Sequence, residues 1–288
     1  MAVRIFSDST SDFPKEMQEE LQLTILPLTF RFGQEQFLQG VELSTRDFYQ
    51  RLREAKELPK STQVAPQAFI DELKPAVEAG DEVVIFTISS ELSGTYQSAC
   101  VARDAFSDAS IYVVDTMTAT LGMQLLIYQA VKMRDEGKSA EEIYNEMMAL
   151  RDRTRIYAII DDLKYLVMGG RLPGAGAKVG GLLKLKPGIM VDPVTGHVKL
   201  LGVVRGLRKG AAWVKEKAEA DGIDASFPVI FGHTDAPDRE QLLFDAYAID
   251  ENAYQIWHHE VGEVIGVHAG PGAMALAFMA QDPAAKAK

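Results

Sequence analysis

The fold of this protein is decided by residues 82–116, EVVIFTISSELSGTYQSACVARDAFSDASIYVVDT. Two short apolar runs rich in β-branched residues, 82–89 and 110–116, flank a longer segment of helical character that begins near Ser93-Gly94-Thr95. Near-continuous apolar strands of this kind are typical of a parallel sheet that helices cover on both faces. The segment therefore predicts a strand, a helix and a second strand of an α/β protein.

The same alternation of strands and helices continues on both sides of this segment. Further short apolar runs are VRIF (3–6), RIYAII (155–160), PVIFGHT (228–234) and EVIGVHA (263–269). Between them lie amphipathic stretches, the clearest of which begins at Ser139, where Glu142 completes a capping box. The sequence becomes richer in glycine after residues 152–156. We therefore predict two α/β domains with open, mainly parallel sheets, residues 1–155 and 156–288.

The composition of the chain argues against several classes of function and indicates the cellular compartment. The 288 residues are 47% hydrophobic and carry a net charge of −11, which argues against a nucleic-acid surface and disfavours adhesion to anionic lipid. The single cysteine, Cys100, cannot form an internal disulfide, as is usual in a reducing compartment. The N-terminus lacks a signal-peptide pattern, and no apolar run approaches the roughly 20 residues of a transmembrane helix. These features predict a cytoplasmic protein without stable membrane insertion.

Two predicted corners of the chain carry small hydroxyl donors. Ser93 and Thr95 lie where a strand gives way to a helix, and helix starts offer unpaired N–H groups to an anion. Ser61 and Thr62 precede a helix expected to begin at Pro66. In both places hydroxyls either cap the helix or donate to a carboxylate.

A third corner carries a histidine. The apolar run Val264–Val267 predicts a strand that ends at His268, followed by a Gly-Pro-Gly turn and then by good helix formers at 273–278. Bare glycine backbone at 266, 270 and 272 permits a ligand to approach closely. His268 titrates near neutrality, so it donates to a carboxylate in either charge state.

The patterns of common enzymes are incomplete in this chain. The stretch SDSTSD (7–12) follows a strand, but Thr10 stands where an aspartate-nucleophile phosphatase needs its second aspartate. There is no phosphate-binding G-x-x-x-x-G-K-[ST] motif, and no histidine spacing typical of a metal site. Two alternatives to ligand binding remain open: a hydrolase or phosphoryl transferase that uses Ser93 as nucleophile and His268 as base, and an interaction scaffold with a glycine-rich contact loop at 169–188.

Motifs spread over nearly the whole chain resemble the DegV family of bacterial fatty-acid-binding proteins. In order they are SDSTSD, LPLTFRFGQEQFLQGVELSTRDFYQRL (26–52), KSTQVAPQAF (60–69), ISSELSGTYQSA (88–99), VVDTMTATLG (113–122), LKYLVMGGRLPG (163–174), LLKLKPGIMVDPVTG (182–196) and IGVHAGPGAMALAF (265–278). Each is unspecific alone, and eight in this order form a strong signal.

The resemblance implies a protein that buries one long-chain fatty acid and keeps its carboxylate near a domain junction. It also implies that a separate ATP-dependent fatty acid kinase converts the bound carboxylate to an acyl phosphate for phospholipid synthesis, so that the chain itself is no enzyme and needs no cofactor. Residues that match the carboxylate-binding motifs are Ser61, Thr62, Ser93, Gly94 and His268, while Arg171 matches a head-group or kinase contact. The family usually has Thr-Ser where this chain has Ser61-Thr62. The sequence therefore does not decide which of the two hydroxyls faces the ligand.

Overall fold

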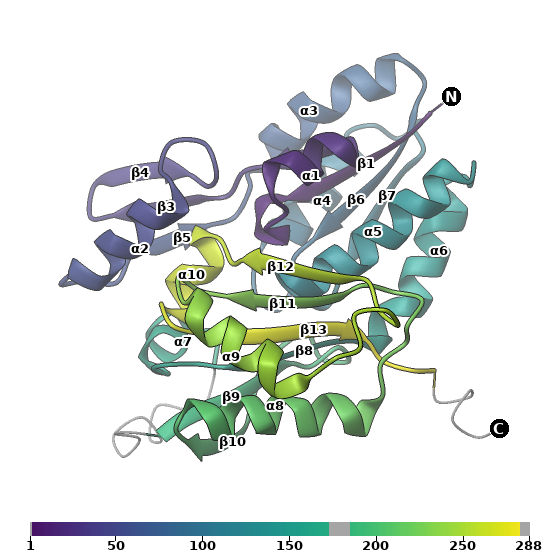
Figure 1. Cartoon of the computed structure of the whole chain (residues 1–288). Helices are drawn as coiled ribbons and strands as arrows, with labels where there is room; N and C mark the ends of the chain where they lie inside the picture. The colour runs from purple at the N-terminus through teal and green to yellow at the C-terminus, as the bar shows by residue number, and fades with distance from the viewer. Residues whose placement is uncertain (1, 173–184, 283–288) are drawn as a thin grey trace.

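The structure, a computed structural model, describes residues 2–172 and 185–282 (Figure 1). In the first part of the chain, four strands form a parallel sheet in the order β2-β1-β6-β7. Their bounds are β1 (Val3–Asp8), β2 (Leu23–Leu26), β6 (Glu82–Thr87) and β7 (Ile111–Asp115). The strand–helix–strand unit predicted from residues 82–116 is confirmed, because α4 (Thr95–Asp104) connects β6 to β7 and the two strands are parallel.

Helices cover both faces of this parallel sheet, which explains why the central residues of β6 and β7 are apolar on both faces. Val83 and Ile85 of β6 pack with the helices of one face, while Val84 and Phe86 pack with those of the other. One face is covered by α3 (Pro66–Glu78) and α4, and the other by α5 (Leu121–Asp135) and α6 (Ala140–Leu150). Helix α6 begins with the predicted capping box.

A second sheet of six strands follows in the order β10-β9-β8-β13-β11-β12. Its strands are β8 (Thr154–Ile159), β9 (Leu185–Val191), β10 (Val198–Arg205), β11 (Val229–His233), β12 (Ile256–Glu260) and β13 (Met274–Met279). The α/β class is confirmed, but this sheet is mixed, since β11–β12 is the one parallel pair among the strands described. Strands β9 and β10 are joined by residues 192–197, a connection long enough for an antiparallel hairpin and too short for a parallel crossover.

The predicted order of strand and helix around His268 is wrong. Residues Glu263–Ala269 form helix α10, and the expected helix at 273–278 is strand β13. Strand β13 lies between β8 and β11, where every one of its side chains is buried, so packing on both faces overrides the helix propensity of its Ala and Met residues. The other helices of this part are α7 (Lys164–Met168), α8 (Leu207–Asp221) and α9 (Pro237–Tyr247).

A small antiparallel module connects the two sheets. It contains β3 (Thr29–Phe32), β4 (Glu35–Leu38), β5 (Lys60–Thr62) and α2 (Thr45–Glu54), and it follows α1 (Lys15–Glu20) and the short helix Ser9–Ser11. Figure 1 shows this module beside α10 of the second part. The phenol of Tyr49 on α2 donates to the Val261 carbonyl oxygen at 2.8 Å. The module thus brings β5 next to the end of α10 that carries His268.

The division into residues 1–155 and 156–288 stays a prediction, and its boundary falls two residues inside β8. A short helix, Arg151–Arg153, precedes that strand. Within the described ranges, no helix combines the length and the apolar character needed to cross a bilayer.

Candidate functional site

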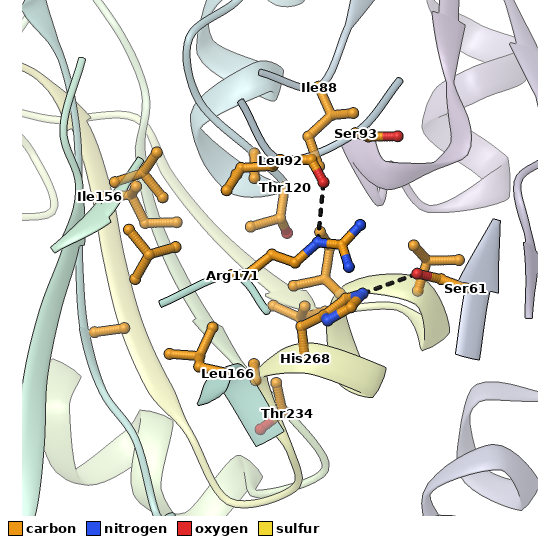
Figure 2. Close-up of a pocket in the computed structure, with 18 of the residues that line it drawn as sticks. Ser61, Ile88, Leu92, Ser93, Thr120, Ile156, Leu166, Arg171, Thr234 and His268 are labelled. Carbon is orange, nitrogen blue, oxygen red and sulfur yellow. Dashed lines mark hydrogen bonds between the residues drawn. The ribbon is translucent and has the colours of Figure 1, made fainter. Parts of the chain in front are cut away.

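A cavity of about 370 Å³ lies between the two sheets and the small module (Figure 2). Its size falls within the range of small-molecule binding sites. All six residues singled out from the sequence line it: Ser61, Thr62, Ser93, Gly94, Arg171 and His268. Residues more than 200 positions apart therefore meet at one site, as Figure 2 shows for Ser61 and His268.

The floor of the cavity is a strip of small side chains on the mixed sheet. Ala158 of β8 pairs in register with Ala275 of β13, and Ala273 lies on the same face two residues earlier. Larger side chains border this strip: Ile156, Ile160, Ile189, Val191 and Val198. Because alanine side chains end at Cβ, they leave an apolar trough between these β-branched neighbours.

The opposite wall is also apolar. It contains Ile88, Leu92, Ala119, Leu166, Val264 and Ile265, which come from the loops of the parallel sheet and from α7 and α10. A cavity with these walls accepts a hydrocarbon chain and offers it no hydrogen-bonding partner along most of its length.

The polar side chains gather around a hydrogen bond between Ser61 and His268. Ser61 Oγ lies 2.8 Å from His268 Nε2. The pleat of β5 sends the neighbouring side chain, Thr62, the other way, where its hydroxyl bonds that of Thr29 on β3. Of the two adjacent hydroxyls, the one on Ser61 therefore contacts the imidazole at the cavity.

Gly169, which the sequence analysis did not single out, leaves room for the His268 ring because it has no side chain. A Cβ on Gly169 would lie 2.3 Å from His268 Nδ1, so any other residue displaces the ring. The expected glycine backbone near the histidine serves other contacts, because Gly266 abuts Tyr49 and Gly270 abuts Tyr165. Burial, and then the charge of the nearby Arg171, lower the pKa of His268 to about 4, so its imidazole is neutral at pH 7.

Ser93 and Gly94 form the loop between β6 and α4. The N-cap of α4 is Gly94, one residue later than expected, and the Ser93 hydroxyl bonds Thr95 Oγ1 at 2.9 Å. A Cβ at Gly94 would lie 2.1 Å from Gln63 Oε1, so a side chain there would displace the Gln63 amide group next to β5. Since Ser93 bonds Thr95 while His268 bonds Ser61, the nucleophile–base pair that the hydrolase alternative requires is not formed.

Arg171 brings a positive charge to this end of the cavity. Its Nε donates to the Leu92 carbonyl oxygen at 3.1 Å, and its Nη1 donates to the Gly169 carbonyl oxygen at 2.7 Å. No aspartate or glutamate within the described ranges forms an ion pair with it, and burial lowers its pKa. A half-buried guanidinium without a counter-charge favours an anionic ligand, because pairing offsets its lost hydration.

The SDSTSD stretch lies beside this cavity and holds strand ends together. Asp8 accepts hydrogen bonds from the Thr10 and Ile88 amides, at 2.9 and 2.8 Å, and Asp12 accepts one from Gln39 Nε2 at 2.8 Å. Burial raises the pKa of Asp8 to about 6 and that of Asp12 to about 8. Within the described part of the chain, no cluster of His, Cys, Asp and Glu side chains is arranged to hold a metal ion.

The raised pKa of Asp12 predicts a pH dependence of stability. The folded chain keeps the Asp12 proton up to about pH 8, while the unfolded chain releases it near pH 4, so the free energy of unfolding falls as pH rises through this interval. The pKa of Asp8 is raised only to about 6, so most of its effect on the free energy of unfolding has already occurred below the pH range of this experiment. In urea unfolding between pH 6.5 and 9, we expect Asp12→Asn to lose less stability than the wild type. Asp108→Asn, at an exposed position, is the control that keeps the wild-type profile. Parallel profiles for Asp12→Asn and the wild type would contradict this account.

Comparisons with known proteins find relatives that match nearly the whole chain. The family model described as an uncharacterised protein of the DegV family matches residues 2–281. A DegV domain-containing protein of Deinococcus radiodurans is 34% identical over 283 residues, covering 96% of this chain and 98% of the relative. One from Caldanaerobacter subterraneus is 33% identical over 280 residues, with the same coverage of 96% and 98%.

Solved structures with the same fold are described as fatty-acid-binding proteins. A DegV family protein from Thermus thermophilus, described by its fatty acid binding, has a TM-score of 0.89 and 28% identity, and the match covers 98% of this chain and 100% of that one. A stearic acid-binding protein from Eubacterium ventriosum has a TM-score of 0.80 and 29% identity, with coverage of 97% and 98%.

Proposed function

Because this chain belongs to the DegV family, we propose that it binds a long-chain fatty acid, with the acyl chain on the alanine floor and the carboxylate at Ser61, His268 and Arg171. The observation that carries this proposal is the half-buried guanidinium of Arg171, which has no carboxylate partner among the described residues and lies at the polar end of an otherwise apolar cavity. A fatty acid supplies both of the missing parts, an anion and a hydrocarbon chain.

Two contributions favour this binding: burial of the acyl chain and hydrogen bonding of the carboxylate. Each methylene group transferred from water to the apolar walls contributes about 0.8 kcal/mol, which favours long chains over short ones. A carboxylate taken out of water needs hydrogen-bond donors or it is costly to bury. Arg171 offers charge-assisted donors, and the Ser61–His268 pair and the Ser93 hydroxyl offer neutral ones.

We also propose that the bound carboxylate is presented to a separate ATP-dependent fatty acid kinase in the cytoplasm, and that the acyl phosphate then enters phospholipid synthesis. What supports this step is the family resemblance together with the lack of a phosphate-binding loop motif in the sequence. Acyl phosphate, trapped as the hydroxamate, is expected only when the loaded chain, ATP and the kinase are all present. Its formation by the loaded chain and ATP alone would contradict this division of labour.

The binding proposal predicts that the purified protein carries lipid. Native mass spectrometry is expected to show one added mass of a long-chain fatty acid, which organic extraction removes and palmitate restores in a 1:1 ratio. The same experiment on Ala158→Leu, in which the alanine floor is filled, serves as the matched control and is expected to show little lipid. An empty protein that takes up neither palmitate nor oleate would overturn the proposal.

A further inference from the structure

Five of the residues that border the cavity carry hydroxyl side chains, and within the described part of the chain one of these hydroxyls has no hydrogen-bond partner. Ser61 bonds His268, Thr62 bonds Thr29, and Ser93 bonds Thr95. The fourth, Thr234, accepts a hydrogen bond from the Ala273 amide at 2.7 Å. The fifth is Thr120, whose Oγ1 is buried and makes no hydrogen bond within the described part of the chain.

The backbone of Thr120 is held in an unusual conformation. Its φ of +45° and ψ of −121° lie where residues other than glycine are rare, and it directly precedes the 15-residue helix α5. Strained residues of this kind persist where the surrounding structure fixes them, and they cluster at ligand sites. Thr120 is only 5% exposed, yet it borders the cavity, so its side chain is fixed at the cavity wall.

Thr120 also lies at the edge of the parallel sheet that supplies Ser93. The two residues follow the carboxyl ends of the adjacent parallel strands β7 and β6. In an open α/β sheet, ligands bind beyond the carboxyl ends of the strands. Figure 2 shows Thr120 among the residues that line the cavity together with Leu92, whose carbonyl oxygen accepts from Arg171. These observations place Thr120 at the polar end of the cavity.

The carboxyl group next to Thr120 belongs to Asp12, and its protonation state allows an anion to bind in the cavity. The Thr120 hydroxyl lies close enough to the Asp12 carboxyl to lower its pKa, against the larger opposing effect of burial, but neither Thr120 Oγ1 nor Asp12 Oδ2 has a partner with full hydrogen-bond geometry in the described part of the chain. Since burial raises the pKa of Asp12 to about 8, this carboxyl is mostly protonated at pH 7 and does not repel a ligand carboxylate. Among the buried side-chain atoms without a hydrogen-bond partner in the described part of the chain, Thr120 Oγ1 and His268 Nδ1 belong to residues that line the cavity, and Thr120 Oγ1 is the hydroxyl of the two.

We propose that the Thr120 hydroxyl is a further ligand-binding group, which donates a hydrogen bond to a carboxylate oxygen of the bound fatty acid. This inference rests on the proposed function and deepens it. Ser61, His268 and Arg171 hold the carboxylate from the side of the small module, α10 and α7, and Thr120 holds it from the edge of the parallel sheet. Buried hydroxyls are seldom left unpaired, and this ligand contact satisfies Thr120.

The test compares Thr120→Val, which keeps the side-chain shape, with Thr120→Ser, which keeps the hydroxyl. Dissociation constants for palmitate and for methyl palmitate are measured with delipidated protein. A lost hydrogen bond to a charged group predicts about tenfold or greater weakening of palmitate binding by Thr120→Val, with a smaller effect on the uncharged ester. Thr120→Ser is expected to retain affinity near that of the wild type. The matched control, Thr116→Val, removes a buried hydroxyl that donates to the Thr87 carbonyl oxygen at 2.8 Å and lies outside the cavity lining, and it is expected to change palmitate affinity less than threefold.

Equal effects of Thr120→Val on the acid and the ester, or no effect on either, would overturn the proposal. If Thr120→Val does not fold, the wild type decides: a structure with palmitate bound must place a carboxylate oxygen within about 3.2 Å of Thr120 Oγ1. A wild type that binds no palmitate at all would overturn the proposed function itself, an outcome distinct from the loss of the Thr120 contact alone.

Discussion

Ala158→Leu is expected to weaken palmitate binding about 100-fold. Ala158 belongs to the alanine floor and lies between Ala275 of β13 and Ile189 of β9, so a leucine there projects into the cavity in which the acyl chain is proposed to lie. Excluding about four methylene groups from the cavity costs about 3 kcal/mol at about 0.8 kcal/mol each, which corresponds to the stated factor. Isothermal titration of delipidated protein with palmitate measures it.

The same substitution is expected to leave the unliganded protein at least as stable as the wild type. Over-packing destabilises a dense core, but here the added side chain enters an existing cavity and buries apolar surface. Ala158→Gly is the control in the opposite direction, with palmitate affinity expected within a few-fold of the wild type. Undiminished palmitate binding by a folded Ala158→Leu protein would show that the acyl chain does not lie on this floor.

Arg171→Met is expected to weaken palmitate binding about 30-fold or more and to stabilise the unliganded protein. Loss of one partner from a buried, hydrogen-bonded charge pair costs about 2 kcal/mol or more, which sets the factor. In the unliganded protein the guanidinium has lost part of its hydration without gaining a counter-charge, so methionine removes an unfavourable term. Binding and stability therefore change in opposite directions.

Two further variants separate this effect from a general loss of structure. Arg103→Met removes an exposed arginine that pairs with Asp104, and it is expected to change neither palmitate affinity nor stability appreciably. Arg171→Lys keeps the charge but loses the planar fork of donors, so an intermediate palmitate affinity is expected. If Arg171→Met destabilised the unliganded protein and bound palmitate normally, Arg171 would be a structural residue that pairs with main-chain oxygens only.

Local patterns were sufficient for much of the fold. The apolar runs at 82–89 and 110–116 marked two parallel strands because burial on both faces removes polar residues from every position. Ser139 and Glu142 marked the start of α6 because a capping box satisfies helix N–H groups through side chains only three residues apart. Both signals are complete within a short window of sequence.

Local patterns failed at 263–279, where neighbours distant in sequence decide the structure. The residues Met274–Met279 have helix propensity, but they occupy a central strand whose partners are β8 and β11. Helix α10 contains seven residues, too few for a helical period to be distinguished from an apolar strand. The alternation of alanine with larger residues in 273–278 was the available signal for a strand with one small-residue face.

The sequence by itself determined the α/β class, most of the individual elements and, through resemblance of motifs, six of the residues that line the cavity. Only the tertiary structure decided how those residues act: that Ser61 rather than Thr62 bonds His268, that Gly169 makes room for the ring, and that Thr120 remains unpaired. The physical reason is that strand and helix periods report which side of a segment is buried. A hydrogen bond between residues 61 and 268 depends on how separate segments pack, and no local period records that packing.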